Sequence, residues 1–513
     1  YDAQVRRPGA SGILVAGTSS DAGKSLVVTG LCRALVRRGV DVAPYKAQNM
    51  SNNSGVCADG AEIGRAQILQ AAAARLEPTS AMNPVLLKPG TDRRAHVVVR
   101  GRPAGVLDAG QYATGRAHLA EAAWAAYAEL EAAHDLVVCE GAGSPAEINL
   151  RSGDYVNLGL ARRFGLPVVV VGDIDRGGVL ASLYGTVALL DDEDRALIRT
   201  FLINKFRGDP GVLAPGLDEI TRRTGVPFAG VLPWLDGVWL DAEDSLEVGA
   251  WRRSARTSGR GLLRVAVVRL PRISNATDVE ALAAEPGVEV LVTTDPEVVA
   301  GADLAVLPGT RATFSDLAWL RRTGIADAVL DRAARDAPVL GVCGGYQMLG
   351  LRVEDPAGVE SEAGTAGEVD GLGLLPVVTR FEREKSLGRP AGSWRGHAVE
   401  AYEIHHGRAA RVGGRDTTTF PEPAEGFLDG WRSGSTWGTV WHGAFENDGF
   451  RRAWLAEAAV AAGSTWTPTP GAPAYGARRE TMVDALADAV EEHLDVDLLL
   501  AGTRVASTAG AAA

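Results

Sequence analysis

The chain has little of what a secreted, membrane-bound or nucleic-acid-binding protein needs. Its 513 residues include only four cysteines, none in a C-x-x-C pair or beside spaced histidines, so neither a disulfide framework nor a zinc site is predicted. Acidic residues outnumber basic residues by 64 to 52, which leaves no basic excess for nucleic acid. No apolar run approaches the roughly 20 residues that span a bilayer. We therefore expect a cytoplasmic protein that has no signal peptide and binds neither nucleic acid nor a membrane.

Short apolar runs alternate with helical patterns along most of the chain. Because this alternation is typical of parallel sheets covered by helices on both faces, it predicts an α/β fold with two doubly wound domains. The strands expected in the first domain cover residues 12–16, 40–46, 136–140, 166–173 and 200–205, and its helices cover 25–38, 113–133, 155–164 and 178–190. The strands expected in the second domain cover residues 262–270, 288–294, 303–309 and 338–345.

A polar stretch rich in arginine and glycine, residues 251–261, separates the two series and is interpreted as a linker. We place the first domain at residues 1–250 and the second at 262–455. A helical extension is expected at 456–500, and the low-complexity end, 501–513, is expected to be disordered. The sequence does not indicate an oligomeric state.

Residues 17–25, GTSSDAGKS, form a phosphate-binding loop with one residue more than the usual G-x-x-x-x-G-K-[ST] pattern. The loop follows a strand and opens a helix, so backbone N–H groups and the helix dipole face the phosphates. In such a loop the lysine reaches the β- and γ-phosphates and the final hydroxyl binds Mg²⁺. We therefore expect ATP to be held by Thr18, Ser19, Asp21, Ala22, Gly23, Lys24 and Ser25.

The extra residue narrows the class of nucleotide-using protein. The loop resembles that of dethiobiotin synthetase and its relatives, which phosphorylate or activate a carboxyl group. Partitioning ATPases instead carry a second lysine five residues before the loop lysine, where this chain has Ser19. The loop therefore predicts an enzyme that transfers a phosphoryl group rather than an ATPase that drives movement. The resemblance also implies that Asn204 contacts adenine, although an asparagine at a strand end is as often a turn residue.

Two carboxylates are candidates for binding a metal beside this loop. Glu140 lies at the end of a predicted buried strand, and Asp59 opens DGAEIGRAQ, an expected helix start. Either acid alone could be a helix cap. Together with the Ser25 hydroxyl they predict a Mg²⁺ site.

The segment PVLGVCGGYQMLG, residues 338–350, places Cys343 between an apolar strand and a predicted helix. Glycines on either side allow the sharp turn of a nucleophile elbow, and a helix N-terminus lowers the pKa of a thiol. The segment resembles the G-x-C-x-G-x-Q core of class I glutamine amidotransferases. That resemblance implies that Cys343 is the nucleophile that releases ammonia from glutamine.

The base that activates this thiol should be a histidine further along the chain. His442, in GTVWHGAFEND, follows a strand and is favoured over His405 and His406. The typical amidotransferase has a glutamate two positions after the histidine, where this chain has Ala444, and Glu446 is expected to point elsewhere. What orients His442 is therefore open.

The oxyanion hole should come from backbone N–H groups next to the thiol. We assign it to Gly309, in the turn LPGT after a predicted strand, and to Gly344, directly after the cysteine.

The two predicted sites have a joint chemistry. Phosphorylation by ATP turns a carboxylate oxygen into a good leaving group, and ammonia from glutamine can then form a carboxamide. Because ammonia is mostly protonated at neutral pH, release inside the protein would preserve its reactivity. An internal passage between the sites would serve this chemistry, but the sequence does not show whether one exists.

The chain as a whole resembles the cobyric acid synthase family, glutamine-hydrolysing amidases of corrin-ring biosynthesis that also lack the glutamate after the histidine. The resemblance rests on the phosphate loop, the cysteine elbow, and the segments YKAQNMSNNSGV (45–56), DGAEIGRAQ (59–67), GDIDRGG (172–178), LPGTRATFSDLAWLR (307–321) and YEIHHG (402–407). It implies a corrinoid substrate, adenosylcobyrinic acid a,c-diamide, amidated on its b, d, e and g side chains. The amide- and hydroxyl-rich loop within residues 45–56 suits the edge of a corrin ring, which carries carboxylates and amides. The residues expected to bind the substrate are Lys46, Gln48, Asn49, Asn52 and Asn53.

Two other functions share part of this pattern. Cobyrinic acid a,c-diamide synthase uses the same two chemistries, but KAQNMSNN argues against it. A partitioning-type ATPase with an inactive amidotransferase-like binding module is the other, and Ser19 and the intact cysteine elbow argue against that.

Overall fold

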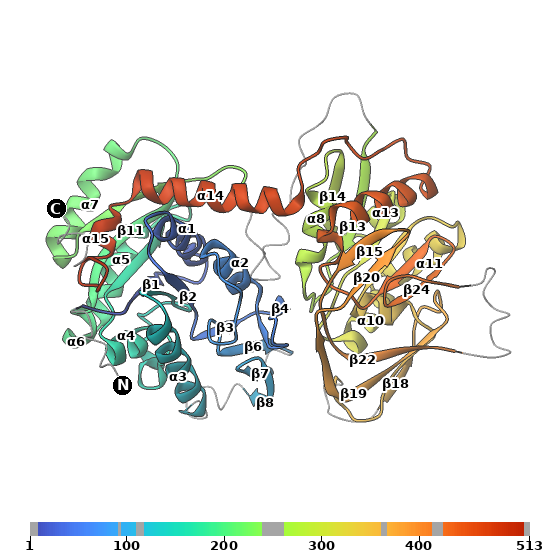
Figure 1. Cartoon of the computed structure of the whole chain (residues 1–513), viewed down its shortest axis with the longest axis horizontal. Coiled ribbons are helices and arrows are strands. Elements are labelled where there is room, and N and C mark those ends of the chain that lie inside the picture. The colour runs from blue at the N-terminus through green and yellow to red at the C-terminus, as the bar shows by residue number, and fades with distance from the viewer. Residues whose placement is uncertain are drawn as a thin grey trace.

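Two lobes, each built around a mostly parallel sheet, make up the structure (Figure 1). The computed structural model describes residues 9–90, 94–108, 117–238, 261–360, 367–412 and 424–506. Apart from Gly261, the expected linker lies outside these ranges.

The N-terminal lobe contains six parallel strands in the order β12-β11-β10-β1-β9-β2. The strands are β1 (Gly12–Gly17), β2 (Val42–Tyr45), β9 (Leu136–Glu140), β10 (Val168–Asp173), β11 (Ile198–Phe206) and β12 (Phe228–Pro233). The helices are α1 (Lys24–Arg37), α3 (Ala117–Ala133), α4 (Leu158–Phe164), α5 (Val179–Leu189), α6 (Asp192–Arg195) and α7 (Pro210–Thr224). The central strands are buried along their whole length, as apolar strands covered on both faces must be. The predicted strands and helices are confirmed here, with residues 113–116 outside the described ranges.

The strand register brings the phosphate loop and polar residues of three other strands to one edge of this sheet. Val15 of β1 is paired with Glu140 of β9, and Asp173 of β10 is paired with Asn204 of β11. Because the strands are parallel, their carboxyl ends meet at the edge where ligands of such sheets bind.

A small sheet and a hairpin, neither of them predicted, follow β2. The sheet contains β3 (Gln48–Met50), β6 (Val85–Pro89), β7 (Arg94–Val99) and β8 (Arg102–Asp108), and the hairpin pairs β4 (Ser54–Val56) with β5 (Glu62–Gly64). The expectation that Asp59 opens a helix is wrong, because Asp59 lies in the hairpin turn and α2 (Arg65–Ala73) begins after β5. The Asp59 carboxylate accepts the N–H of Ala61, and Gly60 takes a φ of 76°, which together close the turn.

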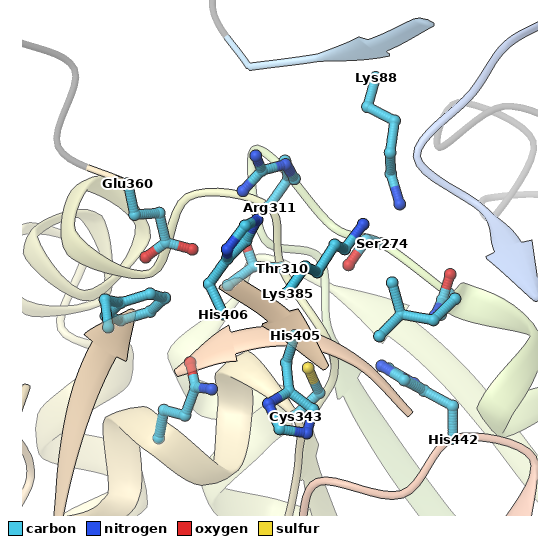
Figure 2. A pocket seen from close by; sticks show the side chains of 14 residues that line it. Lys88, Ser274, Thr310, Arg311, Cys343, Glu360, Lys385, His405, His406 and His442 are labelled. Carbon is cyan, nitrogen blue, oxygen red and sulfur yellow. The ribbon is translucent and has the colours of Figure 1, made fainter. Parts of the chain in front are cut away.

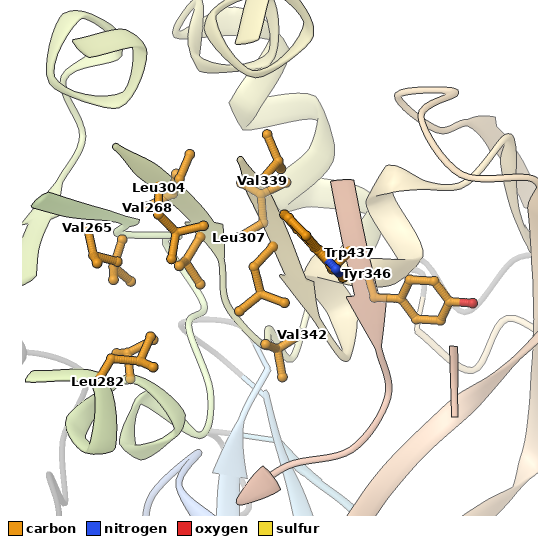
Figure 3. Packing of buried hydrophobic residues seen from close by; sticks show 14 of the residues in the cluster. Val265, Val268, Leu282, Leu304, Leu307, Val339, Val342, Tyr346 and Trp437 are labelled. Atoms are coloured by element: carbon orange, nitrogen blue, oxygen red, sulfur yellow. The ribbon is translucent and has the colours of Figure 1, made fainter. Parts of the chain in front are cut away.

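The C-terminal lobe contains a seven-stranded sheet in the order β14-β13-β15-β16-β25-β24-β23, whose first five strands are parallel. The strands are β13 (Leu263–Val268), β14 (Val288–Thr293), β15 (Leu304–Leu307), β16 (Val339–Val342), β23 (Glu425–Gly426), β24 (Gly430–Ser433) and β25 (Thr436–Thr439). The helices are α8 (Glu280–Ala283), α9 (Pro296–Gly301), α10 (Thr313–Arg322), α11 (Ile325–Ala334) and α12 (Gly344–Leu349). Figure 3 shows Leu307, Val342 and Trp437 in the buried core that these strands form. The predicted strands of this half are confirmed.

A second sheet of this lobe was not predicted. It contains β17 (Arg352–Asp355), β18 (Gly367–Asp370), β19 (Val377–Gly388) and β22 (Glu403–Arg411), beside a hairpin of β20 (Ala391–Trp394) and β21 (His397–Glu400). These strands carry many charged residues and are only partly buried, so they lack the apolar runs by which buried strands are recognised.

The C-terminal helices connect the second lobe back to the first. They are α13 (Asp448–Ala461), α14 (Tyr475–His493) and α15 (Val496–Leu499), and Figure 1 shows α14 spanning the space between the lobes. Apolar residues of α14 join the core around α1, and the buried Arg33 of α1 binds Glu480 and Asp484 of α14. No helix in the described ranges combines the length and apolar character needed to cross a membrane.

The chain end is ordered further than expected. Residues 501–506, assigned to a disordered tail, are described, and Thr503 is buried. The backbone of Ala10 bonds Gly502 and Arg504, so the two ends of the described chain hold each other. Residues 507–513 lie outside the described ranges.

A buried carboxylate joins the two lobes. Glu62 of β5 is 0% exposed, and its carboxylate lies 2.6 Å from Nζ of Lys88 in β6 and 2.5 Å from Nζ of Lys385 in β19. Burial alone would raise the pKa of Glu62, but Lys385 and Lys88 hold it well below its usual range. The carboxylate therefore stays ionised and binds one lysine from each lobe.

Two hydrogen bonds from backbone N–H groups to asparagine side chains also join the two lobes. The N–H of Ser54 donates to Oδ1 of Asn275 at 3.0 Å, and the N–H of Ala276 donates to Oδ1 of Asn53 at 3.2 Å. The predicted substrate loop thus holds the segment that follows β13 in the other lobe.

The contact between α1 and α14 leads to a test of stability. A Cβ at Gly30 would lie 2.7 Å from the backbone oxygen of Leu486 and 2.9 Å from Cγ2 of Val490. We expect Gly30→Ala to lower the thermal unfolding midpoint, because overpacking typically costs about 1–3 kcal/mol. Gly185→Ala in α5 is the matched control, since a Cβ there meets open space and alanine favours a helix by about 0.5–1 kcal/mol. Equal midpoints for the two variants would contradict close packing of α14 on α1.

Candidate active sites

Cys343 lies at the sharp turn between β16 and α12, where the sequence predicts a nucleophile. Its backbone has φ 50° and ψ −108°, a conformation that residues other than glycine rarely adopt. Close packing maintains the turn: a Cβ on Gly344 would lie 2.6 Å from Cγ2 of Thr310, and one on Gly345 would lie 1.9 Å from the Leu307 oxygen. Such strain costs on the order of 1–3 kcal/mol and gathers at functional positions.

The imidazole of His442 lies between the Cys343 thiol and a buried carboxylate. Its Nδ1 donates to Oδ2 of Asp278 at 2.6 Å, and the ring faces the Cys343 sulfur in Figure 2. Burial alone would lower the pKa of His442, but Asp278 and Cys343 raise it to about 10. An imidazolium beside the sulfur at neutral pH is the arrangement that favours a thiolate.

Asp278 is the functional residue that the sequence did not reveal. It lies in a short 3₁₀ turn, Ala276–Val279, 164 residues before His442, and its Oδ1 accepts the N–H of Gly443 at 2.9 Å. The available signal was a polar segment, SNATD, three residues after the end of a predicted strand whose carboxyl end meets the cysteine turn.

The alternatives to His442 and Asp278 have other contacts. Glu446 pairs with Arg65 of the N-terminal lobe rather than with the catalytic histidine. Nδ1 of His405 donates to the Gly407 oxygen, 2.8 Å away, and its Nε2 lies 3.3 Å from Glu403. The geometry therefore supports His442 as the base and leaves Glu446 outside the triad.

The turn after β15 also reaches the thiol. A Cβ on Gly309 would lie 3.1 Å from Cε1 of His442, so this turn packs directly against the imidazole. Among the described residues, the N–H groups of Gly309 and Gly344 have no backbone acceptor. Their role in an oxyanion hole stays a prediction, and their position is compatible with it.

The phosphate loop is closed around its lysine. Nζ of Lys24 donates to the carbonyl oxygens of Ser19 at 2.8 Å and Ser20 at 3.0 Å, and the N–H of Thr18 bonds the Val171 oxygen at 2.9 Å. The loop therefore stays ordered with its lysine at the start of α1, as the motif requires.

Asn204 and its neighbour support the loop from the adjoining strand. Nδ2 of Asn204 donates to the Ala22 oxygen at 3.0 Å, and Nζ of Lys205 donates to the Asp21 oxygen at 2.7 Å. Gly23 has a φ of 89°, and a Cβ there would lie 2.1 Å from Asn204 Nδ2, so only glycine fits. The contact of Asn204 with adenine stays a prediction.

Glu140 is placed beside the loop hydroxyl as expected. The Ser25 hydroxyl donates to Oε1 of Glu140 at 2.8 Å, Lys46 binds the same oxygen at 2.8 Å, and Gln70 of α2 donates to Oε2 at 2.5 Å. Asp59 does not join them, because the hairpin turn holds it at the surface. The described residues contain no group of three or more acidic, histidine or cysteine side chains that could hold a metal.

The loop KAQNMSNN is largely buried. Oε1 of Gln48 accepts a hydrogen bond from the hydroxyl of Tyr155 at 2.5 Å. Nδ2 of Asn49 donates to Oε1 of Gln67 at 3.0 Å. Asn53 holds the other lobe, and Oδ1 of Asn52 is buried without a partner among the described residues. Substrate contact by this loop stays a prediction, and Asn52 has the clearest unused polar atom.

Comparison with known proteins agrees with both sites. Residues 13–248 match the CobQ/CobB/MinD/ParA nucleotide binding domain, and residues 264–450 match the CobB/CobQ-like glutamine amidotransferase domain. The class is therefore that of a glutamine-hydrolysing amidoligase, in which an ATP-using lobe and a glutaminase lobe share one chain.

Relatives identify the family within this class. The chain is 64% identical to the cobyric acid synthase of Cutibacterium acnes, over 96% of this chain and 99% of that protein. It is 57% identical to the cobyric acid synthase of Mycolicibacterium vanbaalenii, with 96% of each covered, and 56% identical to that of Streptomyces coelicolor, with 95% of each covered. The chain belongs to the cobyric acid synthase family, which confirms the resemblance read from its motifs.

The triad geometry predicts the effect of neutralising Asp278. We expect Asp278→Asn to lower the kcat of glutamine hydrolysis by up to about 10⁴-fold, the size known for the corresponding change in a serine protease triad, because the imidazole loses its orientation and its counter-charge. The raised pKa of His442 should fall with that charge, so the alkaline limb of the pH–rate profile should move to lower pH.

Glu446→Gln is the matched control for this prediction, since it removes a neighbouring carboxylate that pairs with Arg65 instead. It should lower hydrolysis far less than Asp278→Asn. Comparable losses in the two variants, or an unmoved alkaline limb in Asp278→Asn, would show that Asp278 does not orient His442.

Proposed function

We propose that this protein uses ATP and glutamine to amidate the side-chain carboxylates of a corrinoid acid, giving adenosylcobyric acid. The observation that carries the proposal is the presence of two assembled sites on one chain, a Cys343–His442–Asp278 triad and a phosphate loop with Lys24, joined by a buried interface. The family supplies the chemical identity of the product.

The glutaminase half follows from the triad. The thiolate of Cys343 attacks the carboxamide carbon of glutamine, and the imidazolium of His442 gives its proton to the departing nitrogen, releasing ammonia. Water, deprotonated by the neutral imidazole, then cleaves the thioester and gives glutamate. The N–H groups of Gly309 and Gly344 stabilise the oxyanion in both steps.

The ATP half activates the acceptor. Lys24 stabilises charge on the γ-phosphoryl group as it passes to a corrinoid carboxylate, and ammonia displaces phosphate from the acyl phosphate to form the amide. Ser25 and Glu140 fit Mg²⁺, because two oxygen donors 2.8 Å apart beside a phosphate loop match an ion that takes few protein ligands. When bound, Mg²⁺ would neutralise phosphate charge. Asp59 is excluded from this site by its position.

The acceptor is adenosylcobyrinic acid a,c-diamide, amidated at the b, d, e and g positions. Gln48 lines a cavity of about 60 Å³ beside the phosphate loop, together with Arg151 and Asn157. One site must serve four differently placed arms, so these side chains hold shared features of the ring edge while the corrinoid dissociates and rebinds between steps. Partly amidated species should therefore appear free in solution by mass spectrometry.

Removal of the Cys343 thiol should affect amidation with glutamine and amidation with ammonium differently. We expect Cys343→Ala to abolish glutamine-dependent amidation and to retain amidation with added ammonium salts, because the thiol acts only in releasing ammonia. Mass spectrometry of the corrinoid after incubation with ATP and either donor measures both rates. Equal loss with both donors would mean that Cys343 is structural.

Removal of the loop lysine should have the complementary effect. We expect Lys24→Ala to abolish amide formation with glutamine and with ammonium, because an oriented cation on the γ-phosphoryl group is worth several kcal/mol of barrier. Glutamine hydrolysis should persist, which shows that the variant is folded. Near-normal amidation with ammonium would contradict the acyl-phosphate role of this loop.

A further inference from the structure

Two connected cavities lead toward Cys343 from the space between the lobes. The inner cavity, of about 40 Å³, is lined by Cys343 and His442. The outer cavity, of about 370 Å³, lies between β7–β8 of one lobe and residues 357–359 of the other. The inner cavity has room for about three water-sized groups, which suits a carboxamide but not a whole amino acid. The head group of glutamine must therefore stay where the two cavities meet.

Four side chains line both cavities and mark this junction: Lys88, Arg311, Lys385 and His406. Lys88 and Lys385 both form ion pairs with Glu62. Burial lowers the pKa of His406 to about 4, and Arg311 contributes to that shift, so this histidine is neutral at neutral pH. Among the described residues, the guanidinium of Arg311 has no hydrogen-bond or ion-pair partner, which makes it the one cation at the junction without a partner.

Glu360 contributes a carboxyl group to the same inner cavity. Its carboxylate accepts the N–H of Thr313 at 3.1 Å and the Thr313 hydroxyl at 3.2 Å, while Asp355 accepts its backbone N–H at 2.9 Å. Figure 2 shows Glu360 and Arg311 reaching into the pocket across from His442. The described residues contain no ion pair between Arg311 and Glu360. A guanidinium and a carboxyl group that share a cavity without pairing match the carboxylate and the ammonium group of a zwitterion.

We propose that Arg311 binds the α-carboxylate of glutamine and that Glu360 binds its α-ammonium group, so that the carboxamide extends into the inner cavity to Cys343. This assignment rests on the proposed glutaminase function. Arg311 and Glu360 would then select glutamine over amides that lack the α-carboxylate or the α-ammonium group.

The loop that carries Arg311 is held firmly enough to act as an anchor. The Thr310 hydroxyl donates to Oδ2 of Asp316 at 2.5 Å, and the backbone N–H of Arg311 bonds the Arg272 oxygen at 3.0 Å. The same loop contains Gly309, the assigned oxyanion donor. One rigid segment therefore sets the distance between the head group of glutamine and its reacting carbonyl.

Burial raises the pKa of Glu360 to about 8, and the Arg311 charge opposes this shift. An ammonium group that enters the cavity would favour the ionised carboxylate further. Without glutamine the carboxyl is mostly protonated at neutral pH, so binding of the zwitterion both compensates the Arg311 charge and ionises Glu360.

Substrate analogues test the Arg311 contact directly. Steady-state hydrolysis of glutamine should be compared with hydrolysis of its α-amide, which lacks the carboxylate charge. The wild-type protein should prefer glutamine in kcat/KM, and Arg311→Met should raise the KM for glutamine by roughly 10–100-fold, as expected for a lost charge-assisted hydrogen bond. The variant should show little preference between the two amides, and Arg311→Lys should recover part of it.

Arg383→Met is the matched control, because Arg383 lines only the outer cavity and also lacks a partner among the described residues. It should keep the preference for glutamine. Amidation with ammonium salts should persist in Arg311→Met, which shows that the variant is folded. A retained preference in Arg311→Met, or an equal loss in Arg383→Met, would overturn the assignment.

The second contact has its own analogue. Glu360→Gln should lose the preference for glutamine over 4-carbamoylbutanoate, which lacks the α-amino group, and should keep the preference over the α-amide. An unchanged preference over 4-carbamoylbutanoate would remove Glu360 from the site. Failure of the wild-type protein to hydrolyse glutamine at all would instead contradict the proposed function.

Discussion

The structure depends on one buried carboxylate between two lysines. Glu62 holds Lys88 from its own lobe and Lys385 from the other, with no exposure to solvent. Buried charges are costly unless each is paired, so separating the lobes would leave Glu62 or Lys385 without its partner. The pair therefore favours one arrangement of the two lobes. Both lysines line the cavity at Cys343, so the same interaction also shapes the path to the glutaminase site.

Helix α2 connects the two sites physically. Gln70 donates to Glu140 beside the phosphate loop, and Arg65, at the start of the same helix, pairs with Glu446, four residues after His442. A nine-residue helix therefore has one contact beside the phosphate loop and another with the segment that follows His442. In the proposed function, ammonia from the glutaminase site reacts with a carboxylate activated at the phosphate loop. Contact between the two lobes suits this transfer, because ammonia that escapes to solvent is protonated.

Much of the molecule could be predicted because its signals are local. The buried strands were recognised from unbroken apolar runs, and Lys24 and Cys343 from short motifs at strand–helix turns. The charged strands β19 and β22 lack such runs, and the Asp59 turn depends on a hairpin rather than a helix. Asp278 is beyond local reasoning, since its role arises only when the segment after β13 meets the loop after β25. The return of α14 to the first lobe is likewise a tertiary contact, invisible in any window of sequence.

In the proposed function, glutamine hydrolysis and ATP use in this chain converge on one acceptor. The most direct measurement is incubation with ATP, a corrinoid acid and glutamine labelled with nitrogen-15 in its amide, with ADP, glutamate and the corrinoid quantified together. The account predicts equal amounts of ADP, glutamate and new labelled amide. Formation of ADP and glutamate without labelled amide on the corrinoid would contradict it.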